Sequence, residues 1–276
     1  MHTPRSDDHS EASSSAAPSP GPTLFGVVNL SPESMVRDSI VRTNEEILAR
    51  AASLAETGVE ILDVGGRSIT PDAPPIDDAE EQRRVLPAIE LLAQHGYRVS
   101  ADTWSSETAI AALGAGAQVV NFTGERASDA LLARVADERA MLALTYMPYG
   151  DAYRMRDAKR VGYSIAALCE HLEPRARRAR DAGIEPERLI LDPNLGIIHP
   201  ETDDYSKAHL QLEVLERIEE LRALGCPLLL YAARKPQRLA RILFAELVLR
   251  ARPDYVRTHE PETLRRLQAA AQESEQ

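Results

Sequence analysis

The sequence predicts an α/β protein with a single (β/α)₈ barrel domain, and three observations support this prediction. Short apolar runs alternate with amphipathic stretches from Thr23 to the end of the chain. Such alternation favours parallel strands joined by right-handed crossovers. The 276 residues are the expected size for eight such units. An open doubly wound sheet is the alternative, but no Gly-x-Gly-x-x-Gly pattern follows the first apolar run.

Eight apolar runs have the length of buried strands. They occupy residues 23–30, 59–66, 98–102, 118–122, 141–147, 188–192, 227–231 and 254–259. Eight stretches have helical spacing, and several of them begin with a capping residue and end at Gly. Pro174 lies inside one stretch and is expected to kink or divide it. The stretches are 44–58, 77–96, 105–116, 128–140, 165–183, 207–225, 236–251 and 261–272.

Composition limits the classes of function. The formal net charge of −11 argues against nonspecific binding to nucleic acid or to an anionic membrane. The chain contains no run of about 18 apolar residues, so no membrane span is expected. Cys169 and Cys226 match no metal-binding spacing and are expected to be buried thiols in a reducing cytoplasm. Residues 1–22 are rich in Ser, Pro and Ala and are expected to be a disordered tail, so the barrel domain spans 23–276.

Polar residues stand at the C-terminal ends of the apolar runs. In a barrel these ends meet in one mouth, where active sites lie. A single Asp or Asn there is often only a helix cap. Eight polar residues on one face instead predict a ligand site: Asn29, Asp63, Asp102, Asn121, Asp192, Lys235, Arg257 and His259.

At these residues the chain resembles the dihydropteroate synthase family of pterin-binding TIM barrels. The resemblance extends from the first strand to the last helix. Seven segments match family motifs in the same order and at the same strand ends. They are NLSPESM (29–35), DVGGRSITP (63–71), SADT (100–103), VNF (120–122), DPNLGIIH (192–199), ARK (233–235) and RTHE (257–260).

The resemblance implies a pterin ring site. Asp192 is expected to accept two parallel N–H bonds from the ring edge, in the geometry of a bidentate pair. Asp102 and Asn121 would complete the ring contacts, and Lys235 would donate to the ring carbonyl or a ring nitrogen.

The resemblance also implies a diphosphate site. Asn29 would contact the diphosphate or its Mg²⁺, the expected cofactor, while Arg257 and His259 would bind phosphate oxygens. The family has a diphosphate-binding arginine in the loop after its second strand, and this chain lacks it. Arg67, three positions earlier, is a candidate to replace that arginine. Lys235, Arg257 and His259 are the expected catalytic residues.

The implied reaction joins (7,8-dihydropterin-6-yl)methyl diphosphate to 4-aminobenzoate, as in folate biosynthesis, and the implied assembly is a homodimer. A non-catalytic pterin-binding protein and a pterin-dependent methyltransferase are the alternatives. Retention of ARK and RTH argues against the methyltransferase.

Several loop positions depart from the family. The first loop has Met35 where the family has Phe, and it lacks the Gly pair. The second loop reads Arg67-Ser68-Ile69-Thr70 instead of Glu-Ser-Thr-Arg. Phe122, Ala233 and His199 replace Asp, Ser and Lys, and the segment 200–206 (PETDDYS) is an unusual polar insert.

Overall fold

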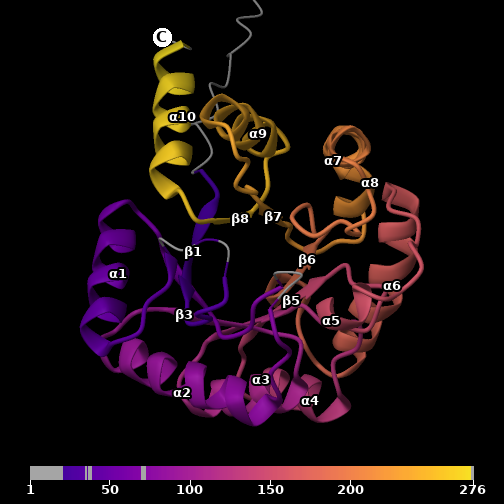
Figure 1. Cartoon of the computed structure of the whole chain (residues 1–276). Helices are drawn as coiled ribbons and strands as arrows, with labels where there is room; N and C mark the ends of the chain where they lie inside the picture. Colours follow the sequence, from indigo (N-terminus) through magenta and orange to yellow (C-terminus); the bar gives the residue numbers. More distant parts are fainter. Residues whose placement is uncertain (1–20, 35, 37–38, 70–72, 275–276) are drawn as a thin grey trace, which may run out of the picture.

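The computed structural model describes residues 21–34, 36, 39–69 and 73–274. A ring of parallel strands in the order β6-β5-β4-β3-β2-β1-β8-β7 forms its centre, surrounded by helices (Figure 1). A parallel bridge between Leu191 and Leu228 joins the two ends of the sheet and closes the barrel. The strands are β1 (Thr23–Asn29), β2 (Ile61–Gly65), β3 (Val99–Thr103), β4 (Val119–Phe122), β5 (Met141–Thr145), β6 (Leu189–Asp192), β7 (Leu229–Tyr231) and β8 (Tyr255–Thr258). The predicted (β/α)₈ barrel is therefore confirmed.

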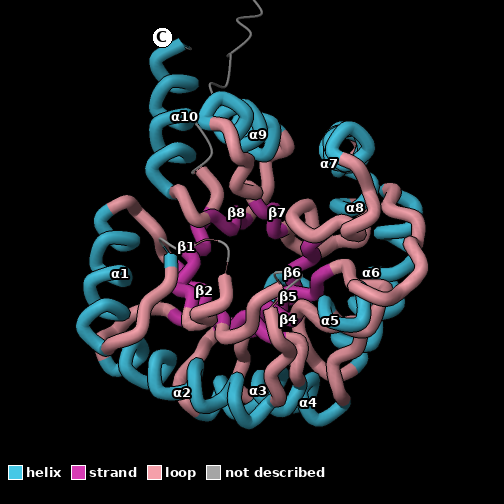
Figure 2. Tube along the Cα trace, viewed as in Figure 1, coloured by secondary structure: helices cyan, strands magenta, loops and turns pink. Residues whose placement is uncertain are grey.

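Helices cover the outside of the ring (Figure 2). Many begin at a side-chain cap: Thr43 and Glu46 form a capping box, and Ser105 accepts a hydrogen bond from the Thr108 amide. The helices are α1 (Asn44–Glu56), α2 (Asp78–Gln94), α3 (Ser106–Gly114), α4 (Asp129–Asp137), α5 (Ala152–Met155), α6 (Ile165–Asp181), α7 (Asp204–Glu216), α8 (Ile218–Arg222), α9 (Arg238–Arg250) and α10 (Pro261–Ser274), with a 3₁₀ turn at Pro186–Arg188.

Strand alternation builds two separate apolar layers. One layer lies between the sheet and the helices and includes Leu62, Val120 and Leu191. The other fills the inside of the barrel, because every second residue of a strand points to the same face. Its buried members are Phe25, Ile61, Val119, Met141, Ala143, Ile190 and Leu229.

The inner layer determines where the polar residues point. Asp63, Asn121 and Asp192 each stand two residues beyond an inner-layer residue of the same strand. They therefore point into the barrel, directly above the apolar filling. Strand register brings neighbours to the same level, since Asp102 pairs with Asn121 and Val27 with Asp63. The barrel thus presents a layer of polar side chains at its C-terminal mouth.

Some element predictions were wrong in detail. The helix with Pro174 runs without division from Ile165 to Asp181, because the rest of its backbone bonds and its buried face hold it together. The stretch 207–225 is not one helix: α7 ends at Glu216, and α8 begins after Arg217. The short helix α5 was not predicted.

Other expectations concern the ends and surface of the chain. Of the expected tail, residues 1–20 lie outside the described residues. Cys226 is buried, whereas Cys169 is only partly buried, and both are free thiols. Within the described ranges, no helix combines the length and apolar character needed to cross a membrane.

Candidate functional site

A cavity of about 310 Å³ opens at the C-terminal mouth of the barrel. Its lining comes from the ends of strands far apart in the sequence, as the polar pattern predicted. Six of the eight predicted strand-end residues line it: Asn29, Asp102, Asn121, Asp192, Arg257 and His259. Asp63 and Lys235 are not among the lining residues, and each has a different position.

Arg257 holds the floor of the cavity together. Its Nε donates to Asp63 Oδ2 at 2.6 Å, and its Nη2 donates to Asp102 Oδ2 at 2.8 Å. Asp63 is fully buried and also accepts from Ser100 Oγ at 2.7 Å and from Asn121 Nδ2 at 3.2 Å. Asp63 therefore lies beneath the cavity and neutralises and orients Arg257, instead of facing a ligand.

Burial and charge strongly perturb two groups on this floor. Burial raises the pKa of Asp102 to about 7, although Arg257 opposes the rise, and Asp63 and Glu81 add to it. The pKa of Arg257 is raised above its ordinary value because Asp63 and Asp102 outweigh the effect of burial. A protonated and an ionised Asp102 are thus both accessible near neutral pH.

Asp192 lies apart from this ion-pair network on β6. Its Oδ1 accepts the Asn194 amide at 2.7 Å. Burial raises its pKa to about 6, while the hydrogen bond from Asn194 and the charge of Arg257 lower it. Asn121 faces the same cavity, and its buried Oδ1 has no hydrogen-bond partner in the described structure. Carboxylate and amide acceptors in a buried cavity suit a planar ring that carries N–H donors.

The turn after Asp192 needs a left-handed backbone at one residue and a glycine at another. Asn194 has a φ of 60°, which lies in the left-handed region that Asn tolerates. Gly196 follows two residues later, and a Cβ there would collide with the ring of Tyr231. Tyr231 in turn lines the cavity, with its ring 5.3 Å from the Arg257 guanidinium carbon. The sequence analysis missed Tyr231, although it ends β7 as the other site residues end their strands.

Lys235 is not among the residues that line the cavity, and its part in ring binding stays a prediction. Its Nζ donates to Gln211 Oε1 at 2.7 Å and lies 4.2 Å from the ring centroid of Phe244. Burial lowers its pKa. The position follows from the loop after β7, which directs the side chain between α7 and α9.

Asn29 and His259 occupy the side of the cavity where the resemblance places an anion. Asn29 Oδ1 accepts the Ser31 amide at 2.9 Å, which orients the amide group. His259 lies with its ring centroid 6.1 Å from that of Tyr231. Arg257 Nη1 forms no hydrogen bond with a described residue, so the N–H groups at this edge of the guanidinium remain for a ligand.

Arg67 lines the cavity but is held by acids of α2. It forms ion pairs with Asp78 and with Glu81, the latter at 3.0 Å, and its guanidinium carbon lies 4.7 Å from the ring centroid of Trp104. Its buried Nε has no partner within the described part of the chain. Burial raises the pKa of Glu81 although Arg67 opposes the rise. Arg67 is therefore mainly fixed to the helix and offers only part of its guanidinium to an anion.

The first loop is also fixed by α2. Glu33 accepts from Arg84 Nη1 at 3.0 Å and from Ser31 Oγ at 2.6 Å. Met35 and Thr70, two of the departures from the family, lie outside the described residues. Ala233 lines the cavity, whereas Phe122 is buried in the outer apolar layer.

A metal site made only of protein side chains is not found among the described residues, since no group of three or more His, Cys, Asp or Glu could hold an ion. Asn29 nevertheless offers an amide oxygen beside the cavity. Mg²⁺ commonly takes few protein ligands and completes its shell with water and substrate phosphates. The residues present fit such a site only if a diphosphate supplies further oxygen ligands.

Comparisons with known proteins agree with this geometry. Residues 25–259 match the family model described as pterin binding enzyme. A dihydropteroate synthase type-1 of Escherichia coli is 30% identical over 257 residues, covering 88% of this chain and 90% of that protein. A dihydropteroate synthase of Staphylococcus haemolyticus is 30% identical over 213 residues, covering 77% of this chain and 74% of that protein.

Solved structures give the same result. The Xanthomonas albilineans dihydropteroate synthase with 4-aminobenzoic acid superimposes with a TM-score of 0.74 at 28% identity, covering 92% of this chain and 93% of that one. The dihydropteroate synthase from Thermus thermophilus in complex with 4-aminobenzoate gives a TM-score of 0.73 at 27% identity, covering 92% of this chain and 94% of that one.

Proposed function

The chain belongs to the dihydropteroate synthase family of pterin-binding enzymes, and we propose that it joins (7,8-dihydropterin-6-yl)methyl diphosphate to 4-aminobenzoate. The observation that carries this proposal is the polar floor of the barrel. There Arg257 joins Asp63 and Asp102, and Asp192 and Asn121 present acceptors to the same cavity. The protein is accordingly a transferase of folate biosynthesis.

The floor binds the pterin ring. Asp192 accepts two N–H bonds from the ring edge, and Asp102 and Asn121 pair with the remaining donors and acceptors. Lys235 joins this site by turning its side chain away from Gln211, whose Oε1 accepts a hydrogen bond from its Nζ. The buried floor excludes water, which strengthens each of these bonds.

The diphosphate lies beside Asn29, Arg257 and His259, and Arg67 contributes what its ion pairs leave free. The C–O bond to the exocyclic CH₂ breaks, and its electron pair leaves with the diphosphate. The nitrogen lone pair of 4-aminobenzoate forms the new C–N bond, and the amine loses a proton to solvent. Arg257 and His259 stabilise the departing charge. Asn29 would hold Mg²⁺ through its amide oxygen, and the ion would neutralise part of that charge.

Turnover tests the proposal directly. The purified protein is incubated with dihydropterin diphosphate, Mg²⁺ and 4-aminobenzoate, and dihydropteroate is measured by chromatography. Product formation at a rate proportional to enzyme concentration is the expected result. Tight pterin binding without product would instead support the non-catalytic alternative, which the ion pairs of Arg67 favour because they occupy a candidate phosphate ligand.

A homodimer is the proposed assembly, and α9 supports it. Leu239, Leu243 and Leu247 follow one another at intervals of four and are 65%, 55% and 39% exposed, so they form one apolar stripe on the helix. Light scattering after gel filtration should give twice the chain mass, and Leu243→Glu should give the monomer. Leu212→Glu, at an exposed position of α7, is the matched control.

The cytoplasm is the proposed location. Cys169 and Cys226 are both free thiols, which suits a reducing compartment.

A further inference from the structure

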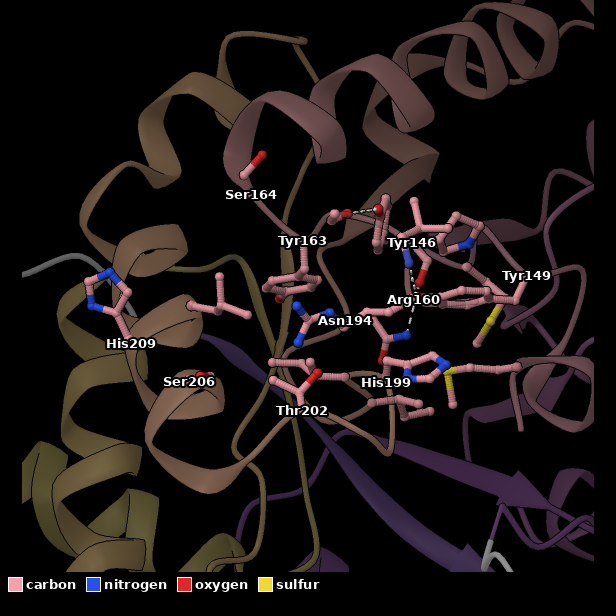
Figure 3. A pocket seen from close by; sticks show the side chains of 18 of the residues that line it. Tyr146, Tyr149, Arg160, Tyr163, Ser164, Asn194, His199, Thr202, Ser206 and His209 are labelled. Atoms are coloured by element: carbon pink, nitrogen blue, oxygen red, sulfur yellow. Dashed lines mark hydrogen bonds between the residues drawn. The ribbon is translucent and has the colours of Figure 1, made fainter. Parts of the chain in front are cut away.

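The described part of the chain contains two cavities that are larger than the ring cavity at the barrel mouth. The first, the aromatic cavity, has a volume of about 620 Å³ and lies between the segments that follow β5 and β6. Tyr149 and Tyr163 contribute rings to its wall (Figure 3). Met147, Asn194 and Ile197 line both this cavity and the ring cavity. The aromatic cavity therefore belongs to the site already described.

The second, which we call the arginine cavity, lies among helices α1, α9 and α10, and Figure 1 shows α9 and α10 side by side. Its volume is about 540 Å³. Of the described residues that line it, His259 is the only one that also lines the ring cavity. Asn29, Arg67 and Arg257, which the proposed diphosphate site uses, do not line it. The arginine cavity is therefore a separate site.

Positive charge dominates the lining of the arginine cavity. Glu260 and Glu262 are the only acids among the described residues that line it, although the whole chain carries a formal net charge of −11. Four arginines from three helices stand against these two acids. They are Arg50 of α1, Arg238 and Arg241 of α9, and Arg266 of α10.

The two acids neutralise these arginines only in part. Glu260 Oε1 contacts Arg241 and also Arg234, the latter at 3.2 Å, so one carboxylate oxygen serves two guanidinium groups. Glu262 lies 3.7 Å from Arg266, and their side chains are 69% and 78% exposed. Such a distant, exposed pair contributes little, because solvent screens it. The cavity therefore retains positive charge for a ligand.

Arg238 has its guanidinium donors available. Its side chain is exposed at the cavity and makes no hydrogen bond or ion pair with any described residue. Arg241 lies three positions further on the same side of α9. Its Nη1 donates to Glu260, and its Nη2 donates to the Pro236 carbonyl at 3.2 Å, which fixes its charge in place. A free guanidinium beside a fixed one suits an anion with several oxygens.

The rest of the lining suits the uncharged part of a small molecule. Leucine, isoleucine and proline side chains give it an apolar surface, and three hydroxyl groups can bond to polar atoms of a ligand. A volume of about 540 Å³ is in the range of small-molecule sites. A phosphate ester combines such an organic part with a group that can pair with more than one arginine. These residues are Leu54, Ile242, Pro261 and Leu267, with Ser53, Thr57 and Thr263.

We propose that the arginine cavity binds a small organic phosphate. The phosphate lies on Arg238 and Arg241, and the organic part lies on the apolar residues. Glu260 connects this cavity to the ring cavity, because Arg234, which shares its Oε1 with Arg241, lines the ring cavity.

This connection gives the site a regulatory consequence. A phosphate that pairs with Arg241 weakens the bond of Arg241 to Glu260, and the carboxylate then holds Arg234 more strongly. Arg234 becomes less available to a diphosphate, so occupation of the arginine cavity opposes binding of the pterin diphosphate. This consequence rests on the proposed function, whereas the binding of an organic phosphate does not.

Calorimetry with adenosine monophosphate, and with adenosine as the probe that lacks the phosphate, tests the binding. The monophosphate should bind at least about tenfold more tightly than adenosine, since only the phosphate pairs with the arginines. Arg238→Gln should weaken its binding at least about fivefold. Arg250→Gln is the matched control, because Arg250 is on the same helix, has a 74% exposed side chain and does not line the cavity.

Asn29→Ala controls for binding in the ring cavity and should leave the affinity for adenosine monophosphate unchanged. Equal affinities for the two probes, no binding of the monophosphate at millimolar concentration, or an affinity that Arg238→Gln does not change would each overturn the proposal.

Steady-state kinetics separate this inference from the proposed function. Saturating adenosine monophosphate should raise the KM for the pterin diphosphate about fivefold in the unaltered protein and in Arg250→Gln, but not in Arg238→Gln. An equal rise in Arg238→Gln would show competition within the ring cavity and overturn the regulatory consequence. Binding that depends on Arg238 in a protein without turnover would refute the proposed function and support the phosphate site.

Discussion

The floor and the rim of the ring cavity are built on different principles. The floor residues Asp63, Asn121 and Arg257 come from strands, and the barrel fixes their direction through strand alternation. Arg67 of the rim and Lys235, which does not line the cavity, come from loops, and side-chain partners outside the cavity fix them. The comparison teaches that the barrel sets the direction of side chains on strands, whereas side chains on loops are open to new partners.

Arg257→Met should have the largest effect, because it breaks the floor. Fully buried Asp63 would lose its cation, which typically destabilises a protein by about 3–5 kcal/mol. Denaturant unfolding should show this loss, and turnover should disappear. Arg84→Met removes an ion-paired arginine of α2 and serves as the control. A free energy of unfolding within about 1 kcal/mol of the unaltered value would contradict the structural role of Arg257.

Asp192→Asn should come next, since it changes the floor without removing a buried ion pair. One acceptor oxygen becomes a donor, so pterin affinity measured by calorimetry should fall at least about tenfold. Thermal stability should not fall, because the substitution removes a carboxylate whose ionisation is disfavoured by burial. Unchanged affinity would show that the pterin does not bind at Asp192.

Opposite effects of pH on affinity and on stability form the third prediction. Burial raises the pKa of Asp102 to about 7 and that of Asp192 to about 6 in the folded protein, so both groups hold protons more strongly than in the unfolded chain. Their contribution to stability should therefore increase as the pH falls from about 7 towards 4. Affinity for a ring that donates N–H bonds needs both groups ionised and should fall by at least about tenfold between pH 7.5 and 6. Parallel trends in calorimetric affinity and melting temperature would refute this coupling.

Substitutions of Gln211 should have the smallest effect on pterin affinity, because they act only through the position of Lys235. Gln211→Leu removes the acceptor that holds Lys235 between α7 and α9, so pterin affinity should rise by about threefold as the lysine becomes available to the ring. Gln211→Glu should hold the ammonium more strongly and lower the affinity by a similar factor. A change in the same direction for both variants would exclude this control of Lys235.

Pattern reasoning succeeded where backbone geometry alone decides position. Asp102, Asn121 and Asp192 each stand at the C-terminal end of an apolar run predicted as a strand, and this position is enough to place these groups in one mouth. It failed where a side chain has several reachable partners. Lys235 follows a matching motif, yet Gln211, 24 positions away, binds it.

The sequence by itself determined the barrel and the floor of its mouth, because strand periodicity has only two possible directions for each side chain. It also determined the family, because seven motifs follow the strands in order. Only the tertiary structure decided that Asp63 lies beneath Arg257 as its counter-ion, and that α2 holds Arg67. It alone revealed the aromatic cavity beside the ring site. Long side chains and loops reach many partners, and the packed neighbours of the folded chain select among them.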